Sequence, residues 1–498
     1  MNVKMKLVAQ GCALALAAAV AHAEIRRSQR SFQDHEVVVE KELLITAPEV
    51  VDSRKTVYPG PWSFGFLMEE AFTEVKAPRV VAGWLEAWAE GDEKADAPPR
   101  PGVRELIRRW RHRDGHRTAD GDWEPNFENA PFRLLAIVNR MDLSLPLAAL
   151  RDEDGEVETP VRSPSLPYYA NGGSLFADST AGEGRFVFAV LDGEGELLDG
   201  GTTLILEYGL HAGSNRENVL NWAMDWHALG KFDNYDGHYL AALASITGRF
   251  TRPNRIDPEA EDDPALRGRL RNASPTQLLR IRTNDGSFGA VREFREFGIR
   301  RISEKEGIAL RAVPVAGTPR VAFFEKGTRE NRWLARWLRR EQRGDLSPAN
   351  ARGDVLRERQ FNMAFPATAR LDGESIPVVA MAAPVPGNNA NYHWDAHSMN
   401  ASYLRRAFSM QTCCGCHCGD TATRFFHIEP RPAGKEASLS RYLARKADKV
   451  VIRDPASRRQ VKLQEMEERR IVFEEFLNPG LTNTKAAGIR ERRRERAH

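Results

Sequence analysis

Four of the five cysteines lie between positions 413 and 418, and the fifth, Cys12, lies near the start of the chain. Disulfides among four such close cysteines cannot join distant parts of a folded chain. The fold must therefore be stabilised by burial of apolar side chains. A chain of 498 residues is long enough to bury a sizeable core, and its length predicts two or three domains or one large one.

The first 23 residues have the pattern of an export signal. Lys4 and Lys6 precede an almost wholly apolar run at 7–20, and Ala-His-Ala at 21–23 is a small-x-small cleavage site. The run is too short to span a bilayer, and Cys12 lies in its middle rather than at a lipidation position. We therefore predict a mature protein that begins at Glu24 and is periplasmic or secreted.

The net charge excludes one class of function. The net charge of +3 falls to +1 after cleavage, because Lys4 and Lys6 leave and no acidic residue leaves with them. A nearly neutral chain is not drawn as a whole to nucleic acid or to a membrane surface. No later segment has enough consecutive apolar residues for a transmembrane helix. We expect neither a nucleic-acid partner nor an integral membrane segment in the mature protein.

Strands are predicted where apolar residues alternate or run continuously between turn residues. The strongest signal is the buried run at 131–143, and the glycine-rich stretch 192–201 suits a hairpin between two further strands. The other expected strands lie at 36–48, 185–191, 202–208, 277–282, 290–300, 309–315 and 376–384. Their concentration in the middle of the chain predicts an α+β fold with a mostly antiparallel central sheet.

Helices are predicted where apolar residues recur every three or four positions. They are expected at 62–72, 79–90, 103–112, 214–230, 235–247, 330–342, 398–410, 438–447 and 462–477. Ser214 and Glu217 form a capping box at the start of the fourth. His227 and His238 lie on the two central helices, and we interpret both as packed side chains rather than metal ligands.

Composition divides the chain into five parts. We predict the signal peptide at 1–23, a mixed N-terminal region at 24–120 and a central α+β domain at 121–390. A helical C-terminal region at 391–480 carries the cysteines, and residues 481–498 form a basic, disordered tail.

The cysteine segment contains a C-x-x-C-H motif made by Cys413, Cys416 and His417. Two thiols at this spacing can bond the two vinyl groups of one haem, and the adjacent imidazole can then bind the iron. The motif therefore predicts covalently bound haem c, with Cys413 and Cys416 as attachment residues and His417 as an axial iron ligand.

Two other interpretations use the same residues. A disulfide between Cys413 and Cys416 would close a small ring in an oxidising compartment. A zinc ion, the alternative cofactor, would take Cys413, Cys416 and Cys418 with His417 or His427. Cys418 is a ligand only in this zinc site. No thioredoxin-like context surrounds the motif to indicate an exchange-active dithiol.

A haem iron held by His417 has a second axial position. We predict His427 as the second axial ligand, because Phe425 and Phe426 beside it suit a haem crevice. The other candidates near the motif are His393, His397, Met399 and Met410. Two filled axial positions would suit electron transfer with a redox partner protein, whereas an open position would permit small-molecule chemistry.

Hydrolytic and phosphate-binding motifs are absent from the sequence. It contains no G-x-S-x-G, no H-E-x-x-H and no phosphate-binding glycine loop. The alternative to a haem protein is therefore a non-catalytic envelope or interaction protein whose cysteines form a structural disulfide or zinc site.

Several short motifs carry a resemblance. They are GEGRFVF at 182–188, W-x3-WHALG ending at 230, RTN at 282–284, REF at 292–294, TCxGCH at 412–417 followed by Asp-Thr, and FHIEPR at 426–431. Together they resemble a group of exported bacterial proteins over most of the mature chain. That resemblance implies export but no particular activity.

The C-x-x-C-H motif alone resembles the haem-attachment site of cytochromes c. The chain departs from a plain cytochrome through the extra thiols of Cys414 and Cys418. It also departs through the long polypeptide around the motif.

Overall fold

A computed structural model describes most of the chain between residues 36 and 478. The described residues are 36–73, 75–91, 99–115, 123–144, 181–192, 194–198, 201–210, 216–252, 278–284, 294–303, 307–313, 321–341, 368–371, 374–377, 393–396, 399, 403–409, 419–423, 427–444, 450–463 and 465–478. The predicted signal peptide and the basic tail lie outside these residues.

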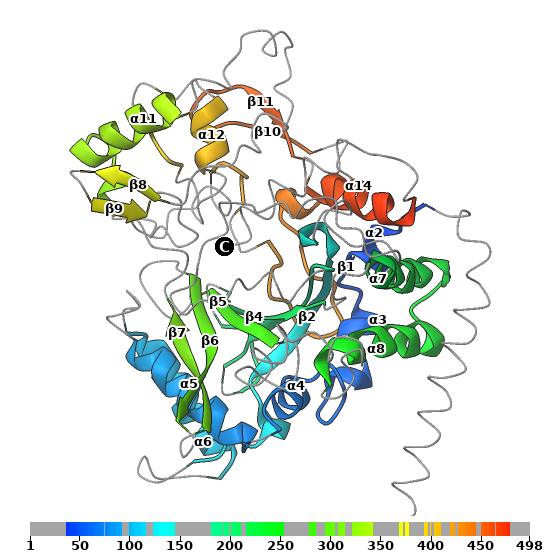
Figure 1. Ribbon diagram of the computed structural model, residues 1–498. Coiled ribbons are helices and arrows are strands. Elements are labelled where there is room, and N and C mark those ends of the chain that lie inside the picture. The colour runs from blue at the N-terminus through cyan, green and yellow to red at the C-terminus, as the bar shows by residue number, and fades with distance from the viewer. Residues whose placement is uncertain are drawn as a thin grey trace, which may run out of the picture.

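A seven-stranded antiparallel sheet forms the centre of the molecule (Figure 1). Its strands are β1 (Leu44–Ile45), β2 (Phe132–Arg140), β3 (Glu183–Val190), β4 (Thr203–Gly209), β5 (Leu278–Asn284), β6 (Phe294–Ser303) and β7 (Gly307–Val313). Strand order in the sheet equals chain order, so within the described part of the chain each strand of the sheet pairs only with its sequence neighbours. The predicted α+β class with a mostly antiparallel central sheet is confirmed.

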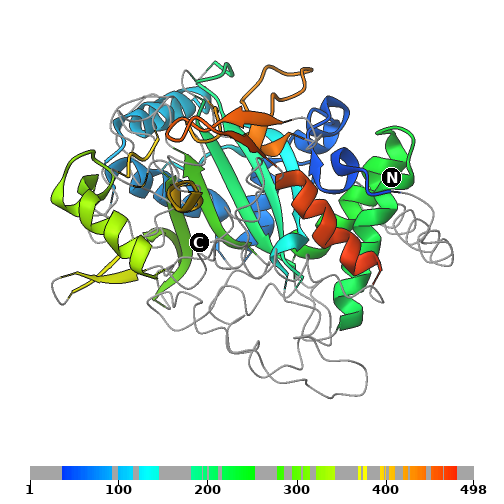
Figure 2. The ribbon, with the colours of Figure 1, turned by 90° about the horizontal axis from the view of Figure 1, so that it is seen from above.

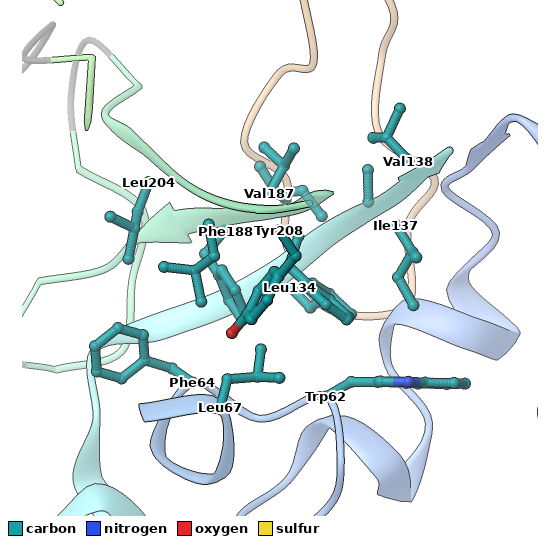
Figure 3. Packing of buried hydrophobic residues seen from close by; sticks show 14 of the residues in the cluster. Trp62, Phe64, Leu67, Leu134, Ile137, Val138, Val187, Phe188, Leu204 and Tyr208 are labelled. Carbon is teal, nitrogen blue, oxygen red and sulfur yellow. The ribbon is translucent and has the colours of Figure 1, made fainter. Parts of the chain in front are cut away.

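One face of the sheet is apolar. Side chains along a strand alternate between the two faces, and the large apolar ones of the central strands point to the same face. Figure 3 shows Leu134, Phe188 and Tyr208 on the side of the sheet where Trp62 and the start of α4 lie. Phe188 meets the α4 residue Phe64 edge-to-face at 6.2 Å between ring centres, and the side chains of this interface are buried. This interface forms the main hydrophobic core.

Three N-terminal helices cover the apolar face, namely α4 (Phe64–Ala71), α5 (Ala77–Glu90) and α6 (Pro101–Arg113). Helix α5 buries Val81, Trp84, Leu85 and Trp88, which recur at helical spacing. Trp84 contacts the β6 residue Phe297 edge-to-face at 5.8 Å. The N-terminal region therefore shares one core with the central sheet.

Two further helices, α7 (Arg216–Ala228) and α8 (Gly237–Thr251), lie side by side at the β2 end of the sheet (Figure 1). Asp236 caps α8 by accepting hydrogen bonds from the backbone N–H groups of His238 and Tyr239, at 2.9 and 3.1 Å. The predicted cap of α7, Ser214, lies outside the described residues.

The C-terminal elements lie on the opposite side of the sheet from α4 to α6 (Figures 1 and 2). They include α11 (Arg329–Glu341), α12 (Tyr403–Ser409) and α14 (Glu465–Leu477). Two small antiparallel hairpins accompany them, β8 (Thr368–Leu371) with β9 (Glu374–Pro377) and β10 (Val451–Arg453) with β11 (Gln460–Lys462). Short 3-10 helices lie at Arg54–Thr56, Phe127–Asn129, Met141–Leu143, Leu229–Lys231, Val321–Phe323 and Arg441–Leu443.

Two predictions of secondary structure are wrong. Residues 36–48 do not form one strand but the helix α2 (Val39–Glu42), the two-residue β1, and the start of the helix α3 (Pro48–Val51). Their apolar side chains are buried on all sides, which removes the periodicity that separates helix from strand. The helix expected at 438–447 is instead a single 3-10 turn that Ser440 caps. The strand expected at 376–384 begins within β9, and its remainder lies outside the described residues.

None of the described helices is both long enough and apolar enough to cross a membrane.

Candidate functional site

The predicted cofactor residues Cys413, Cys416 and His417, together with Cys418, lie outside the described residues. The structure describes both flanks of the segment that carries them. Helix α12 ends at Ser409, and the chain is described again from Gly419. We call residues 410–419 the cysteine segment.

A buried ionic cluster joins the two ends of the cysteine segment. Arg405 on α12 donates from Nη2 to Oδ1 of Asp420 at 2.5 Å and from Nη1 to Oδ2 at 3.2 Å. The Ser409 hydroxyl donates to Oδ2 of the same carboxylate at 2.6 Å. All three side chains are fully buried. The residue before the cysteine segment is thus hydrogen-bonded to the residue that follows it.

Asp454 extends this cluster to the β10–β11 hairpin. Arg405 Nη2 donates to its Oδ2 at 2.8 Å, while the backbone N–H groups of Ala456 and Ser457 donate to its Oδ1 at 3.0 and 2.6 Å. Arg405 Nη1 also donates to the carbonyl of Trp394 at 3.1 Å. One guanidinium therefore ties together four separate parts of the chain. We call Arg405, Ser409, Asp420 and Asp454 the clasp.

Within the clasp, Arg405 and Asp454 each stabilise the charged form of the other. Burial opposes the charge of Arg405, but Asp420 and Asp454 outweigh it and raise the pKa of the guanidinium above its usual value. Burial likewise opposes the charge of Asp454, but Arg405 and the N–H of Ser457 lower the pKa of that carboxyl. The Arg405–Asp454 ion pair is therefore favoured at neutral pH.

His427, the predicted second axial ligand, lies a few residues beyond the clasp. Its Nδ1 is 2.9 Å from the hydroxyl of Ser440, and its ring stacks on Tyr442 with centroids 4.8 Å apart. The backbone of His427 has a φ of +45°, which a non-glycine residue rarely adopts. Burial lowers the pKa of His427 to about 3, so the imidazole is neutral at pH 7, the form that binds metals.

Helix α14 supports the position of the His427 ring. The Tyr442 hydroxyl donates to Oε2 of Glu465 at 2.9 Å, and Glu465 in turn pairs with Arg469 at 2.9 Å. This chain of contacts fixes the aromatic ring against which His427 packs.

The remaining axial candidates differ in their surroundings. Met399 is only 2% exposed, as expected of a core methionine. His393 is partly buried, while His397 and Met410 lie outside the described residues. Within the described part of the chain, no group of three or more His, Cys, Asp or Glu side chains is arranged to hold a metal ion.

A second buried cluster covers the other face of the central sheet. It consists of three glutamates and three arginines on four adjacent strands. Five of the six are at most 4% exposed, and the side chain of Arg185 is 14% exposed. The members are Glu183, Arg185, Glu207, Arg280, Arg282 and Glu296. We call this group the ionic face.

The strand register explains the ionic face. Glu207 on β4 lies directly opposite Arg185 on β3 and Arg280 on β5, and Arg282 lies opposite Glu296 on β6. Arg185 Nη1 is 3.1 Å from Oε1 of Glu207, and Arg282 Nε donates to Glu296 at 3.2 Å. Opposite charges on neighbouring strands therefore meet side by side.

The ionic face points away from α4. Val138 and Val187 point to that side of the sheet in Figure 3, and Arg185 pairs in register with Val138. The C-terminal elements lie on the same side (Figure 2). Arg133 on β2 donates to the carbonyl of Arg431 at 3.3 Å, which joins this side of the sheet to the segment that follows His427.

Two glycines of the GEGRF motif have structural roles. Gly182 has a φ of +95°, and a Cβ there would lie 2.4 Å from the carbonyl oxygen of Arg140. A Cβ on Gly184 would lie 2.6 Å from the ring of Phe250. Gly182 therefore allows the chain before β3 to approach the backbone at the end of β2, and Gly184 allows Phe250 to pack closely on β3. The neighbouring Glu183 and Arg185 belong to the ionic face.

His227 forms a buried pair with Glu42 on α2. Its Nδ1 lies 2.8 Å from Oε2 of Glu42, and the two side chains are 2% and 0% exposed. Oε1 of Glu42 accepts a hydrogen bond from the N–H of Val38 at 2.7 Å. His227 is thus packed in the core, as expected, with a carboxylate as its partner. The interpretation of His238 as a packed side chain is wrong, because His238 is exposed at the N-terminal end of α8.

The pKa of His227 predicts a loss of stability in acid. Burial, aided by Lys231, lowers it to about 4, below the usual value of about 6.5 for an unfolded chain. The unfolded state therefore binds the proton first, and stability falls as the pH drops from about 6.5 towards 4. Urea unfolding at pH 7 and pH 5 measures this loss, which His227→Gln should reduce. An equal pH dependence in the variant would contradict the assignment, and His238→Gln is the exposed control.

The ionic face and the clasp were not among the sequence-predicted sites. The alternation of charged and apolar residues in GEGRFVF and in LLRIRTN was a signal for strands with one charged face. Which charges meet across the strands depends on register, which these short patterns do not specify.

The described structure defines an α+β protein in which a central sheet carries a buried ionic face and a clasp brackets the cysteine segment. The chain matches no protein-family model, no curated protein and no solved structure. The resemblance to exported bacterial proteins therefore stays a prediction from the sequence motifs.

Proposed function

We propose that this is an exported redox protein that binds one haem c covalently through Cys413 and Cys416, with His417 as an axial ligand. The observation that supports this most is the C-x-x-C-H motif on a segment whose ends are joined by the fully buried clasp. The chain thus enters and leaves this segment at one fixed, buried hydrogen bond. We place the protein in the periplasm or outside the cell, with a redox partner protein.

The residues around the cysteine segment fit this group in their chemistry. A bound haem would supply one-electron chemistry. His427 offers a neutral imidazole whose ring is fixed by Ser440 and Tyr442, which is what a second axial ligand requires. The clasp uses no thiol and no histidine, so it is complete whether or not a cofactor is attached.

A structural role is the second candidate, favoured by the extra thiols of Cys414 and Cys418. In that case the segment holds a disulfide or a zinc ion, and the protein is a non-catalytic envelope or interaction protein. Zinc would use Cys418 together with Cys413, Cys416 and a histidine.

The haem proposal predicts a covalent chromophore. Expressed in the periplasm with haem-maturation genes, the protein should show a Soret band and keep its haem after denaturation. Cys413→Ala with Cys416→Ala should abolish covalent haem, because no thioether bond remains. Cys414→Ala with Cys418→Ala is the matched control and should leave the haem content unchanged.

Other results would support the structural role. A colourless wild-type protein with the mass of the bare polypeptide would refute haem attachment. Elemental analysis that finds zinc, or a mass that shows two thiols lost to a disulfide, would then identify which structural site is present.

A further inference from the structure

We propose that the outward side of helix α11 is a docking surface for a protein that presents a row of carboxylates. The surface consists of the exposed residues Arg329, Arg332, Arg336 and Arg340, with the ring of Trp333 beside them. We call it the arginine row. The inference concerns a partner protein, and it does not depend on which group the cysteines bind.

The spacing of the four arginines places them along one side of the helix. Successive members of the row are three or four residues apart, which makes them neighbours on a helix surface. At about 1.5 Å per residue, the row is about 16 Å long. All four residues are exposed, and α11 lies at the edge of the molecule (Figures 1 and 2).

The opposite side of α11 is fixed to the rest of the protein. Trp337 and Leu338 are at most 5% exposed. The Asn331 amide donates from Nδ2 to the carbonyls of Phe323 and Asp395, at 3.1 and 3.0 Å. The helix therefore presents the arginine row to solvent on an ordered backbone, so a partner has little ordering entropy to overcome.

The charge of α11 is only partly compensated within the helix. The helix contains five arginines and two glutamates, which gives it a net charge of +3. The whole chain has the same net charge of +3, so the residues outside α11 are neutral in sum. Arg336, near the middle of the row, has no hydrogen bond or ion pair with another described residue. A local positive potential of this kind attracts an acidic surface.

Helix α6 shows how this chain neutralises arginines elsewhere. Arg108 and Arg109 on α6 pair with Glu105 at 2.6 and 2.7 Å, and Arg111 pairs with Glu86 on α5 at 3.4 Å. These arginines already have carboxylate partners within the protein. The arginine content of a helix therefore does not by itself create a docking surface, and α6 provides the control positions for a test.

The residue types of the row favour a protein as the partner. A guanidinium binds a carboxylate through two parallel hydrogen bonds, which an ammonium group cannot do, and α11 contains no lysine. Trp333 is partly exposed three positions before Arg336, and its ring stacks on Trp337 with centroids 6.2 Å apart. Tryptophan and arginine are enriched among the residues that dominate binding at protein interfaces.

A membrane and a nucleic acid fit this surface less well. A helix that lies in a membrane interface inserts its apolar side, but the apolar side of α11 is buried in the protein. A nucleic acid is bound by a basic surface that follows its backbone, and this row is short on a chain that is otherwise neutral in sum.

The test uses the full chain with poly-L-glutamate as the acidic probe, and it measures affinity by biolayer interferometry at low and high salt. We expect Arg332→Gln with Arg336→Gln to lower the affinity at low salt about tenfold, which corresponds to about 1.4 kcal/mol. The wild-type affinity should fall as salt rises, because exposed charges are screened. Arg104→Gln with Arg108→Gln on α6 is the matched control, which removes the same charge from exposed positions and should leave the affinity unchanged.

The other outcomes would overturn the proposal. A wild-type protein that does not bind poly-L-glutamate would do so, as would equal affinities of the two double variants. Tighter binding of phosphatidylglycerol vesicles or of duplex DNA through Arg332 and Arg336 would assign the row to a membrane or to a nucleic acid. A wild-type dimer at low salt that Arg332→Gln with Arg336→Gln dissociates would assign it to a second copy of this chain.

Discussion

Replacing Arg405 with methionine is expected to lower the free energy of unfolding by about 3–5 kcal/mol. The substitution keeps an apolar side chain in the site but leaves the carboxylates of Asp420 and Asp454 buried without their main cation. Removing one partner of a buried ion pair is costly because the other charge remains desolvated. Equilibrium urea unfolding measures the change.

The control for this prediction is Arg336→Met on the exposed face of α11, where the change should be within about 0.5 kcal/mol. Arg406 is a second buried cation at this site, 3.3 Å from Asp454 and 3.6 Å from Asp420, so in Arg405→Met both carboxylates keep Arg406 but lose Arg405. If Arg405→Met is as stable as the control, the clasp does not contribute to stability in the way its geometry indicates.

Glu207→Gln should have a comparable effect, lowering the free energy of unfolding at pH 7 by about 3 kcal/mol or more. Glu207 is fully buried and pairs with Arg185, Arg280 and Arg282. A neutral amide at this position leaves three buried arginines with too few compensating charges. Glu86→Gln, at an exposed position on α5, is the control and should change little.

The effect of Glu207→Gln should depend on pH. Burial opposes the charge of Glu207, but Arg185, Arg280 and Arg282 outweigh it and hold the pKa of this carboxyl well below its usual range. The stabilisation is therefore present above the unfolded pKa of about 4.3 and is lost as the pH falls further towards the folded pKa. Unfolding curves at pH 7 and pH 3 should show a smaller difference between wild type and variant at pH 3. An undiminished difference would contradict the assignment.

Periodicity predicted most of the regular structure. The strands from β2 to β7 and the helices α4 to α8 fall close to their expected positions, because each has one buried face that repeats along the sequence. The prediction for residues 36–48 was wrong for a physical reason. Their apolar side chains are buried on all sides, so no repeat in the sequence distinguishes three short elements from one strand. The β10–β11 hairpin was missed because only one residue of each strand is buried.

The two ionic clusters illustrate what a single sequence does not reveal. Arg405, Asp420 and Asp454 are separated by 15 and 34 positions and look like ordinary surface charges in the sequence. Only the fold shows that they are fully buried and paired. The C-x-x-C-H motif, by contrast, was visible at once because its chemistry depends on local spacing alone.

The order of strands in the sheet has a consequence for how the newly made chain matures. Since each described strand of the sheet pairs with its neighbours along the chain, the sheet can assemble progressively from β1 to β7 as residues leave the ribosome. The cysteines follow the last strand of the sheet, yet the bonds from Arg405 to Asp454 require a further stretch of chain after them. The clasp is therefore complete only after the β10–β11 hairpin has been synthesised, and until then Arg405 lacks the carboxylate of Asp454.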